Sequence, residues 1–407
     1  AFIEANPVLQ FGAGTDTSLV KVLNTVYQSG PEGWGTILIN FLFGAWFGRV
    51  LMDTGIAGTI IRKTVELGGD KPLITVILLD VVTSMTGAGP VMAVGVIVLP
   101  ILMSLGIPKA ISLFTFIASV GAGSYLNPVF FAQYRAFVID PSELPDFTFG
   151  WYAHQWGYAA TAIMVVVSIV MTAIYLRGSK KSHAWAAQAA PQARKDAPGY
   201  TLILPLVPVI LNIAFNFSVI GGFLLAGLLA LFFCGKFDKG FRENIQYLNK
   251  LMYDGTVDTA PMVGFLVCLP MFNTVAKYAS PYFSAVLGPI IPTSPLMICV
   301  LFTVLLFFSL FRGPLTLVGC GAATLGVLKN VASFSVPFMY CVFAIPTITG
   351  NLGSCITQSW TAWGLSYTKV ESKDFLRLSV PTLYVGGALL FVLTYITMSN
   401  LGTAWFV

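Results

Sequence analysis

Long apolar stretches separated by short polar loops run through this chain of 407 residues. About 20 apolar residues cross the roughly 30 Å hydrocarbon layer of a bilayer as a helix, and pairs of shorter stretches can form hairpins. The pattern therefore predicts an all-α polytopic membrane protein. The expected spans lie near residues 33 to 50, 72 to 85, 88 to 104, 111 to 139, 152 to 176, 200 to 217, 219 to 235, 258 to 275, 296 to 311, 313 to 327, 334 to 365 and 380 to 398.

Two of these stretches are too long for one crossing and contain helix-breaking residues. The stretch 111 to 139 contains GAGSYLNP at 121 to 128, and the stretch 334 to 365 contains PTITGNLGS at 346 to 354. Glycine and proline interrupt helices because one is conformationally free and the other lacks a backbone donor. We expect two discontinuous transmembrane helices.

Composition and charge agree with a membrane protein. Hydrophobic residues make up 56% of the chain and charged residues 10%, against about 25% charged in soluble domains. The net charge of +5 does not indicate nucleic-acid binding, because the basic residues occupy short loops and form no basic face. Loops 49 to 71, 105 to 110, 177 to 199, 236 to 250 and 366 to 379 hold 17 of the 22 Lys and Arg residues. These loops are expected to be cytoplasmic, in a multi-pass protein of the inner (plasma) membrane.

The two halves share one order of features. Gly89-Pro90 and Gly313-Pro314 lie 224 residues apart, and Gln133 and Gln358 lie 225 apart. With the basic loops inside, the first half starts outside-to-inside and the second starts inside-to-outside, provided that 72 to 104 and 296 to 327 each enter and return on one side. This pattern predicts two inverted repeats with re-entrant hairpins, which is typical of secondary transporters.

The expected domains follow from this repeat. They are an extramembrane segment 1 to 32, a first repeat 33 to 176, a basic cytoplasmic connector 177 to 199, a helical hairpin and linker 200 to 257, and a second repeat 258 to 398. The first thirty residues lack the basic and apolar regions of a signal peptide, and no initiator methionine begins them. We expect a segment upstream of Ala1.

Arg312 ends the apolar run 300 to 311, just before Gly313-Pro314. A permanent cation at membrane depth costs about 2.5 to 3.5 kcal/mol, so it normally faces a partner, a wet cavity or an anionic ligand. Two interpretations stay open. Arg312 either pairs with a carbonyl or carboxylate to lock two helices, or it binds an anionic substrate.

Polar and small residues at the turns and breaks are the other candidates for a substrate site. Interrupted helices leave backbone groups without partners, which a membrane tolerates only beside protein or a wet cavity. Small and hydroxylated residues also serve close helix packing, but their symmetric placement together with Arg312 favours a site. The candidates are Thr83, Ser84, Thr86, Gly87 and Gly89 in the first half, Thr316 in the second, and Asn127, Gln133, Asn351, Ser354 and Gln358 in the broken helices.

Asp80 is an ionisable residue inside the apolar run that starts near Ile74. A carboxylate in that setting suits a proton carrier, but it would equally suit a partner for Arg312 or a helix end. Sodium is the alternative coupling ion. Six cysteines without a C-x-x-C pair and two histidines indicate no metal site, and no cofactor is expected.

Several short motifs carry a resemblance to a known family. They are GAWFGRVLMDTG at 44 to 55, IRK at 61 to 63, VGVIVLP at 94 to 100, and the segment 360 to 379 with KDFLR at 373 to 377. They resemble the gluconate:proton symporter (GntP) family of the ion transporter superfamily. The resemblance implies inverted repeats with hairpins and broken helices, uptake of small organic acids, and proton coupling. Gluconate members tend to carry an acid shortly before the V-G pair, where this chain has Ala93, which argues against gluconate itself.

The sequence therefore predicts a secondary active transporter that couples a cation, with the proton preferred, to symport of a small organic anion such as a sugar acid. A sodium/proton antiporter would require a cluster of carboxylates at the membrane midplane, and the sequence supplies only Asp80 as a candidate. A membrane subunit of an ion-translocating enzyme complex would need a catalytic constellation, and the sequence shows none, so we expect no enzyme. The expected partners are the anionic substrate and the lipid bilayer, with a homodimer left open.

Overall fold

The computed structural model describes residues 19–67, 77, 81, 90–104, 106–139, 143–178 and 196–399. All regular elements in these residues are helices. The predicted candidates Asp80, Thr83, Ser84, Thr86, Gly87 and Gly89 lie outside the described residues. The helices are α1 Leu19–Asn24, η2 Thr25–Ser29, α2 Gly30–Glu32, α3 Gly35–Asp53, α4 Ile56–Leu67, α6 Pro90–Ser104, α7 Lys109–Ser124, α8 Pro128–Val138, α9 Phe149–Tyr152, η3 Ala153–Gly157, α10 Tyr158–Arg177, η4 Gly199–Leu206, α11 Val207–Phe215, α12 Val219–Phe233, α13 Phe241–Leu287, α14 Pro295–Val304, η5 Leu306–Arg312, α15 Gly321–Val331, α16 Val336–Ile345, η6 Pro346–Leu352, α17 Ser359–Thr368 and α18 Ser372–Met398.

Only some helices cross a membrane without a break. In the described residues, Phe149–Arg177 and Ser372–Met398 are long and apolar enough to span, which agrees with the spans expected at 152 to 176 and 380 to 398. The pair α7 and α8 bends by 65°, and the pair α14 and η5 bends by 63°. The discontinuous helix expected over 111 to 139 is confirmed. The all-helical membrane fold is confirmed with it.

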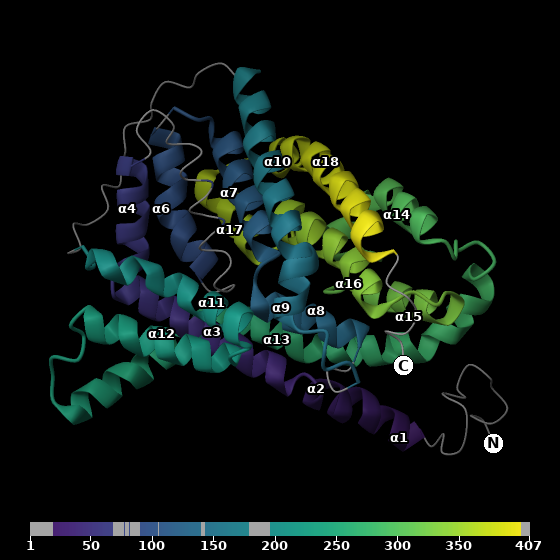
Figure 1. Cartoon of the computed structure of the whole chain (residues 1–407), viewed down its shortest axis with the longest axis horizontal. Coiled ribbons are helices and arrows are strands. Elements are labelled where there is room, and N and C mark those ends of the chain that lie inside the picture. The colour runs from purple at the N-terminus through teal and green to yellow at the C-terminus, as the bar shows by residue number, and fades with distance from the viewer. Residues whose placement is uncertain are drawn as a thin grey trace.

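The elements separate into two regions in Figure 1. Helices α1 to α3 run along one edge beside α13, and α11 and α12 lie at the end of this pair. Helices α7, α10 and α18 pack together on the other side, with α16 against α18. Both broken helices belong to this second region.

Helices α2 and α3 pack antiparallel to α13 with reciprocal contacts. A Cβ added to Gly30 would lie 3.2 Å from the Pro270 carbonyl oxygen, and one added to Gly255 would lie 3.0 Å from that of Ala45. Gly30 and Gly255 are 225 residues apart, as are Ala45 and Pro270. The contact is therefore self-complementary, as between elements related by a two-fold axis. Inverted repeats predict this packing.

The loop expected over 236 to 250 is largely helical, which corrects that expectation. Helix α13 begins at Phe241 and continues unbroken to Leu287, across the expected boundary at residue 257. Residues 241 to 253 (FRENIQYLNKLMY) contain neither glycine nor proline and several strong helix formers. Local propensity therefore extends the helix beyond the apolar stretch. The second arm of the 296 to 327 hairpin also begins late, because α15 starts at Gly321.

Candidate functional site

The first broken helix is interrupted at Asn127. Its side-chain oxygen accepts hydrogen bonds from the backbone N–H groups of Val129 at 3.0 Å and Phe130 at 3.3 Å. Pro128 occupies the first helical position, where a missing N–H costs nothing. Asn127 thus caps α8, which explains the presence of this predicted site residue by local structure.

The second broken helix passes through a π-helical segment. α16 continues directly into η6, and α17 starts only at Ser359. Residues 346 to 354, where the interruption was expected, therefore stay helical, and the break lies at 355 to 358. π-helical turns are rare and frequently occur at functional sites. The two helices touch just before their breaks, because a Cβ added to Gly121 in α7 would lie 3.0 Å from the Cα of Gly353, near the end of the helical run that starts with α16. Glycine at both positions lets the two backbones approach this closely.

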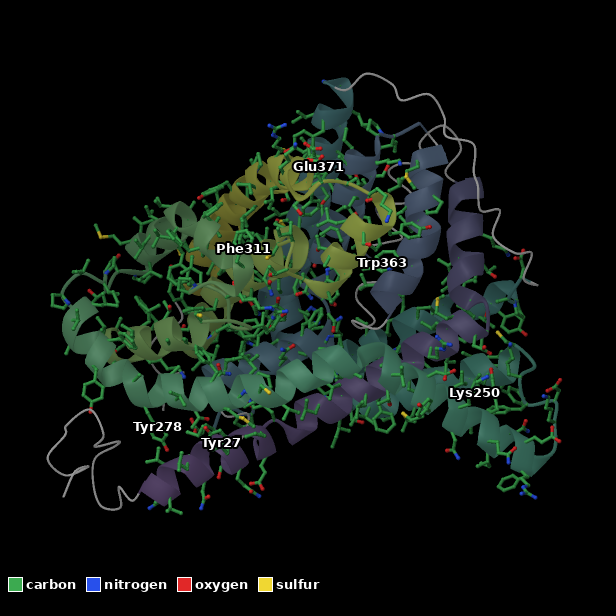
Figure 2. All side chains as sticks on the ribbon, turned by 180° about the vertical axis from the view of Figure 1, so that it is seen from behind. Tyr27, Lys250, Tyr278, Phe311, Trp363 and Glu371 are labelled. Atoms are coloured by element: carbon green, nitrogen blue, oxygen red, sulfur yellow. The ribbon has the colours of Figure 1, made fainter. Side chains whose placement is uncertain are left out.

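Arg312 lies in a strained turn at the end of η5. Phe311 and Arg312 both have left-handed backbone conformations, with φ of 55° and 57°, which cost about 1 to 2 kcal/mol each for residues other than glycine. The Phe311 N–H donates to Cys355 Sγ at 3.1 Å, and the Arg312 carbonyl accepts from the Cys320 N–H at 3.1 Å. Figure 2 labels Phe311, which marks the position of this turn. Such strain persists where surrounding contacts fix it and is common at ligand sites.

Seven residues from α8, the Arg312 turn and the second broken helix line a small buried cavity of about 10 Å³, room for about one water molecule. They are Phe130, Gln133, Tyr134, Arg312, Val318, Leu352 and Gln358. The structure thus brings together three predicted site residues, Gln133, Arg312 and Gln358. Arg312 is the one charged residue among the described residues of this lining, and its Nη1 donates to the Val318 carbonyl at 3.1 Å. We name this space the central cavity.

Buried polar atoms gather near the central cavity. The Gln358 amide nitrogen and the Tyr134 hydroxyl are buried with no hydrogen-bond partner among the described residues, as are both amide atoms of Asn351. Each such group costs about 1 to 3 kcal/mol if it stays unsatisfied. A polar ligand at this place would recover that free energy.

Two predicted residues have structural roles away from the cavity lining. The Thr316 hydroxyl donates to the Ser309 carbonyl at 2.6 Å, and the Ser354 carbonyl accepts from the Ser379 hydroxyl at 3.3 Å. Asn351 lies in η6 and is fully buried, but it does not line the cavity. Thr316 and Ser354 thus hold neighbouring segments together near the cavity.

Sequence reasoning missed four lining residues, Phe130, Tyr134, Val318 and Leu352. Tyr134 follows Gln133 directly and is a hydroxyl-bearing residue in an apolar stretch, so it carried a usable signal. The other three are apolar, and nothing in the sequence distinguishes them from ordinary core residues. The left-handed turn at Phe311 and Arg312 was also unforeseen, because the run before it looks continuously helical.

The arrangement is that of a multi-pass membrane protein with two broken helices that meet beside a partly buried cation. Among solved structures, the chain is similar to the YdaH transporter of Alcanivorax borkumensis, whose crystal structure is described as having an unusual topology. The TM-score is 0.61 at 15% identity, over 93% of this chain and 88% of that one. This likeness shows a shared fold. No family model and no curated protein matches the chain, so the resemblance to gluconate:proton symporters rests on the short motifs alone.

Proposed function

We propose that this protein is a secondary active transporter that carries a small organic anion by symport with a cation. One observation carries the proposal. The Arg312 guanidinium and the carboxamides of Gln133 and Gln358 line the same buried cavity, where two broken helices cross.

The chemistry of the lining suits a carboxylate with hydroxyl groups. A guanidinium presents a planar fork of donors that matches a carboxylate, and glutamine amides both donate to and accept from hydroxyls. Among the residues that the structure describes, the cavity lining holds no acidic residue, so the charge of this part of the lining favours an anion. A hydroxylated acid, such as a sugar acid, satisfies both features.

Transport rather than static binding follows from the size of the central cavity. A space for about one water does not admit an organic acid, so binding requires the walls to separate. The cavity lies between elements of the two halves, which is where alternating access moves one part of a transporter against the other. The fold shared with the YdaH transporter supports the same conclusion.

The proton is the proposed coupling ion, and Asp80 the proposed carrier. Sodium held by backbone carbonyls at the two breaks is the alternative. Exchange of protons for sodium without an organic substrate is less consistent with a cavity whose charged residue is an arginine.

Uptake by proteoliposomes tests the proposal. We expect labelled hydroxy acids to accumulate when an inward proton gradient is imposed, and Arg312→Ala to abolish that accumulation. A sodium gradient imposed at constant pH identifies the coupling ion. Proteoliposomes that accumulate no member of a broad carboxylate panel under either gradient would exclude anion symport.

A further inference from the structure

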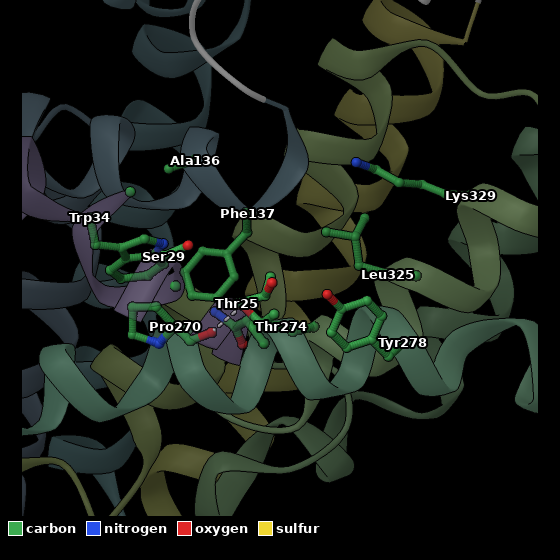
Figure 3. A pocket seen from close by; sticks show the side chains of 15 residues that line it. Thr25, Ser29, Trp34, Ala136, Phe137, Pro270, Thr274, Tyr278, Leu325 and Lys329 are labelled. Atoms are coloured by element: carbon green, nitrogen blue, oxygen red, sulfur yellow. Dashed lines mark hydrogen bonds between the residues drawn. The ribbon is translucent and has the colours of Figure 1, made fainter. Parts of the chain in front are cut away.

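A second and larger cavity lies at one end of the α3 and α13 pair. It measures about 400 Å³, which is within the range of small-molecule sites. Figure 3 shows its lining. Ser29 comes from η2, Trp34 precedes α3, Tyr278 lies on α13, Phe137 on α8 and Lys329 on α15. We name it the outer cavity, because α8 ends there, and residues 140 to 146 (DPSELPD), which follow α8, are expected from the sequence to lie opposite the basic cytoplasmic loops.

Asn273 gives the outer cavity an unsatisfied polar group. Its side chain lines the cavity, the residue is 6% exposed, and neither amide atom has a hydrogen-bond partner among the described residues. The amide nitrogen needs an acceptor and the amide oxygen needs a donor. A ligand that carries both a carboxylate or carbonyl and a hydroxyl would satisfy the pair.

The rest of the lining adds one cation and an aromatic wall. Lys329 is the one charged residue among the described residues that line the cavity, and its ammonium group donates to the Val138 carbonyl. The Trp34 and Phe137 rings pack edge to face with centroids 4.7 Å apart (Figure 3). A lysine ammonium attracts an anion, and aromatic faces bind an apolar body.

The outer cavity and the central cavity share α8. Gln133 lines the central cavity, and Phe137, four residues later, lines the outer one. Four residues are about one helical turn, or about 6 Å along the axis. The Arg312 turn and α15 make a second link, because Val318 lines the first cavity and Ala322 the second.

The two ends of the α3 and α13 pair differ in a way that the repeat makes visible. Ser29 and Thr274 line the outer cavity. Their counterparts 225 residues away are Asp254 and Arg49, which form an ion pair at 3.5 Å. Equivalent positions of the two repeats therefore differ. An ion pair joins them at one end of the α3 and α13 pair, whereas at the other end they line a cavity.

We propose that the outer cavity is a second binding site, on the path to the central cavity, for an organic carboxylate that also carries a hydroxyl and an apolar body. Lys329 attracts the carboxylate, Asn273 binds the hydroxyl and carboxylate pair, and the rings of Trp34 and Phe137 cover the apolar part. The position on the path rests on the proposed transport function. Binding itself does not, because it is measured without transport.

Calorimetry on the full chain in nanodiscs of zwitterionic lipid tests the site, with mandelate as the probe. Phenylacetate lacks the hydroxyl of mandelate, and mandelamide lacks its charge. We expect Asn273→Leu to weaken mandelate binding by about tenfold or more, because the variant loses the hydrogen bonds between the buried amide and the ligand. Phenylacetate should lose less affinity than mandelate in Asn273→Leu, because it keeps the carboxylate but lacks the hydroxyl that would donate to the Asn273 amide oxygen. Lys329→Gln should weaken mandelate but not mandelamide, and Lys250→Gln, an exposed lysine elsewhere on α13, is the matched control.

Each outcome decides the proposal. Unchanged mandelate affinity in Asn273→Leu overturns it. If that variant fails to fold, Leu325→Trp fills the cavity instead, and unchanged binding there also overturns it. A lipid headgroup is the alternative occupant, and nanodiscs of phosphatidylglycerol test it. The proposal is overturned if mandelate no longer binds in these nanodiscs, and if the purified wild type retains bound phosphatidylglycerol whereas Lys329→Gln does not. Arg312→Ala separates the two sites, because it should remove transport while Asn273-dependent binding persists.

Discussion

Tyr125 and Thr349 are joined by a hydrogen bond between their hydroxyl oxygens at 2.6 Å, and they lie 224 residues apart. The same offset relates Pro90 to Pro314. Each residue therefore contacts its own counterpart in the other half. Two equivalent positions can meet in this way only close to the axis that relates them. An axis that relates the two halves would therefore pass close to Tyr125 and Thr349.

We expect Tyr125→Phe to lower the free energy of unfolding by about 1 to 2 kcal/mol, because it leaves the buried Thr349 hydroxyl without this partner. Thr349→Val should cost a similar amount. The double variant should cost little more than either single one, since both remove the same bond. Reversible unfolding in mixed detergent measures all three. Fully additive losses would show that the two hydroxyls are not coupled.

The close approach of the two breaks gives a second prediction. Gly121→Ala places a methyl group 3.0 Å from the Gly353 Cα, and overpacking of this kind costs about 1 to 3 kcal/mol. Because neither backbone can yield without moving a break, transport should fall with stability. Gly264→Ala in α13 is the matched control, since a Cβ there meets nothing within 4 Å. It should be neutral or slightly stabilising. Equal behaviour of the two variants in unfolding assays would contradict tight packing at the crossing.

The sequence predicted two interrupted helices and placed Gln133 and Gln358 among the candidate site residues, because glycine, proline and repeated polar residues are typical of interruptions. The position of the second interruption was wrong, since residues 346 to 354 stay helical and the break follows them at 355 to 358. The sequence did not predict the start of α13. Hydropathy finds apolar stretches, whereas residues 241 to 253 continue the helix through local propensity. The two signals have different physical origins, so boundaries drawn from one miss the other.

The outer cavity was invisible in the sequence for another reason. Asn273 and Trp34 lie more than 200 residues apart and meet only through the antiparallel packing of α3 and α13. An isolated asparagine in an apolar stretch indicates nothing by itself. Its significance comes from burial without a partner, which only three-dimensional packing determines.

Arg312 should bind substrate through the geometry of its guanidinium as well as its charge. Arg312→Ala is expected to cost about 2 kcal/mol or more in binding, or about 30-fold in Kd. Arg312→Lys should lose less, because it retains the charge without the planar fork. Calorimetry with a transported acid measures both, and thermal unfolding checks that the variants fold. Wild-type affinity in Arg312→Ala would exclude direct coordination.

Asp80 lies outside the described residues, and its proposed role is tested by function. If it carries the proton, Asp80→Asn should abolish accumulation driven by a pH gradient, while substrate exchange across the membrane, which needs no net proton movement, survives. If it neutralises Arg312, the same change should destabilise the protein by about 3 to 5 kcal/mol, as for a broken buried pair. A stable variant that still accumulates substrate in response to pH would contradict both roles and favour sodium.

Charged residues close the end of the α3 and α13 pair opposite the outer cavity. Arg49 pairs with Asp254, and Asp53 accepts hydrogen bonds from Lys236 at 3.2 Å and from Tyr247. Burial raises the pKa of the Tyr247 phenol, and the bond to the Asp53 carboxylate raises it further, so the phenol remains a donor at neutral pH. These contacts link α3 to the loop before α13 and to α13 itself.

The Arg49 and Asp254 pair should favour the state that is open at the outer cavity. Both side chains are partly exposed, so the pair contributes up to about 1 kcal/mol, or about a fivefold shift in population. We expect Arg49→Ala and Asp254→Ala to slow maleimide labelling of a cysteine at Ala136 in the outer cavity, in a background without Cys268 and Cys320. Exchanging the two charges in a double variant should restore the rate, since the pair is rebuilt with opposite polarity. Labelling that stays at the wild-type rate in both single variants would show that this ion pair does not bias the equilibrium between states open and closed at the outer cavity. The difference between the two ends of the α3 and α13 pair would then reside in the packing of α8 and α15.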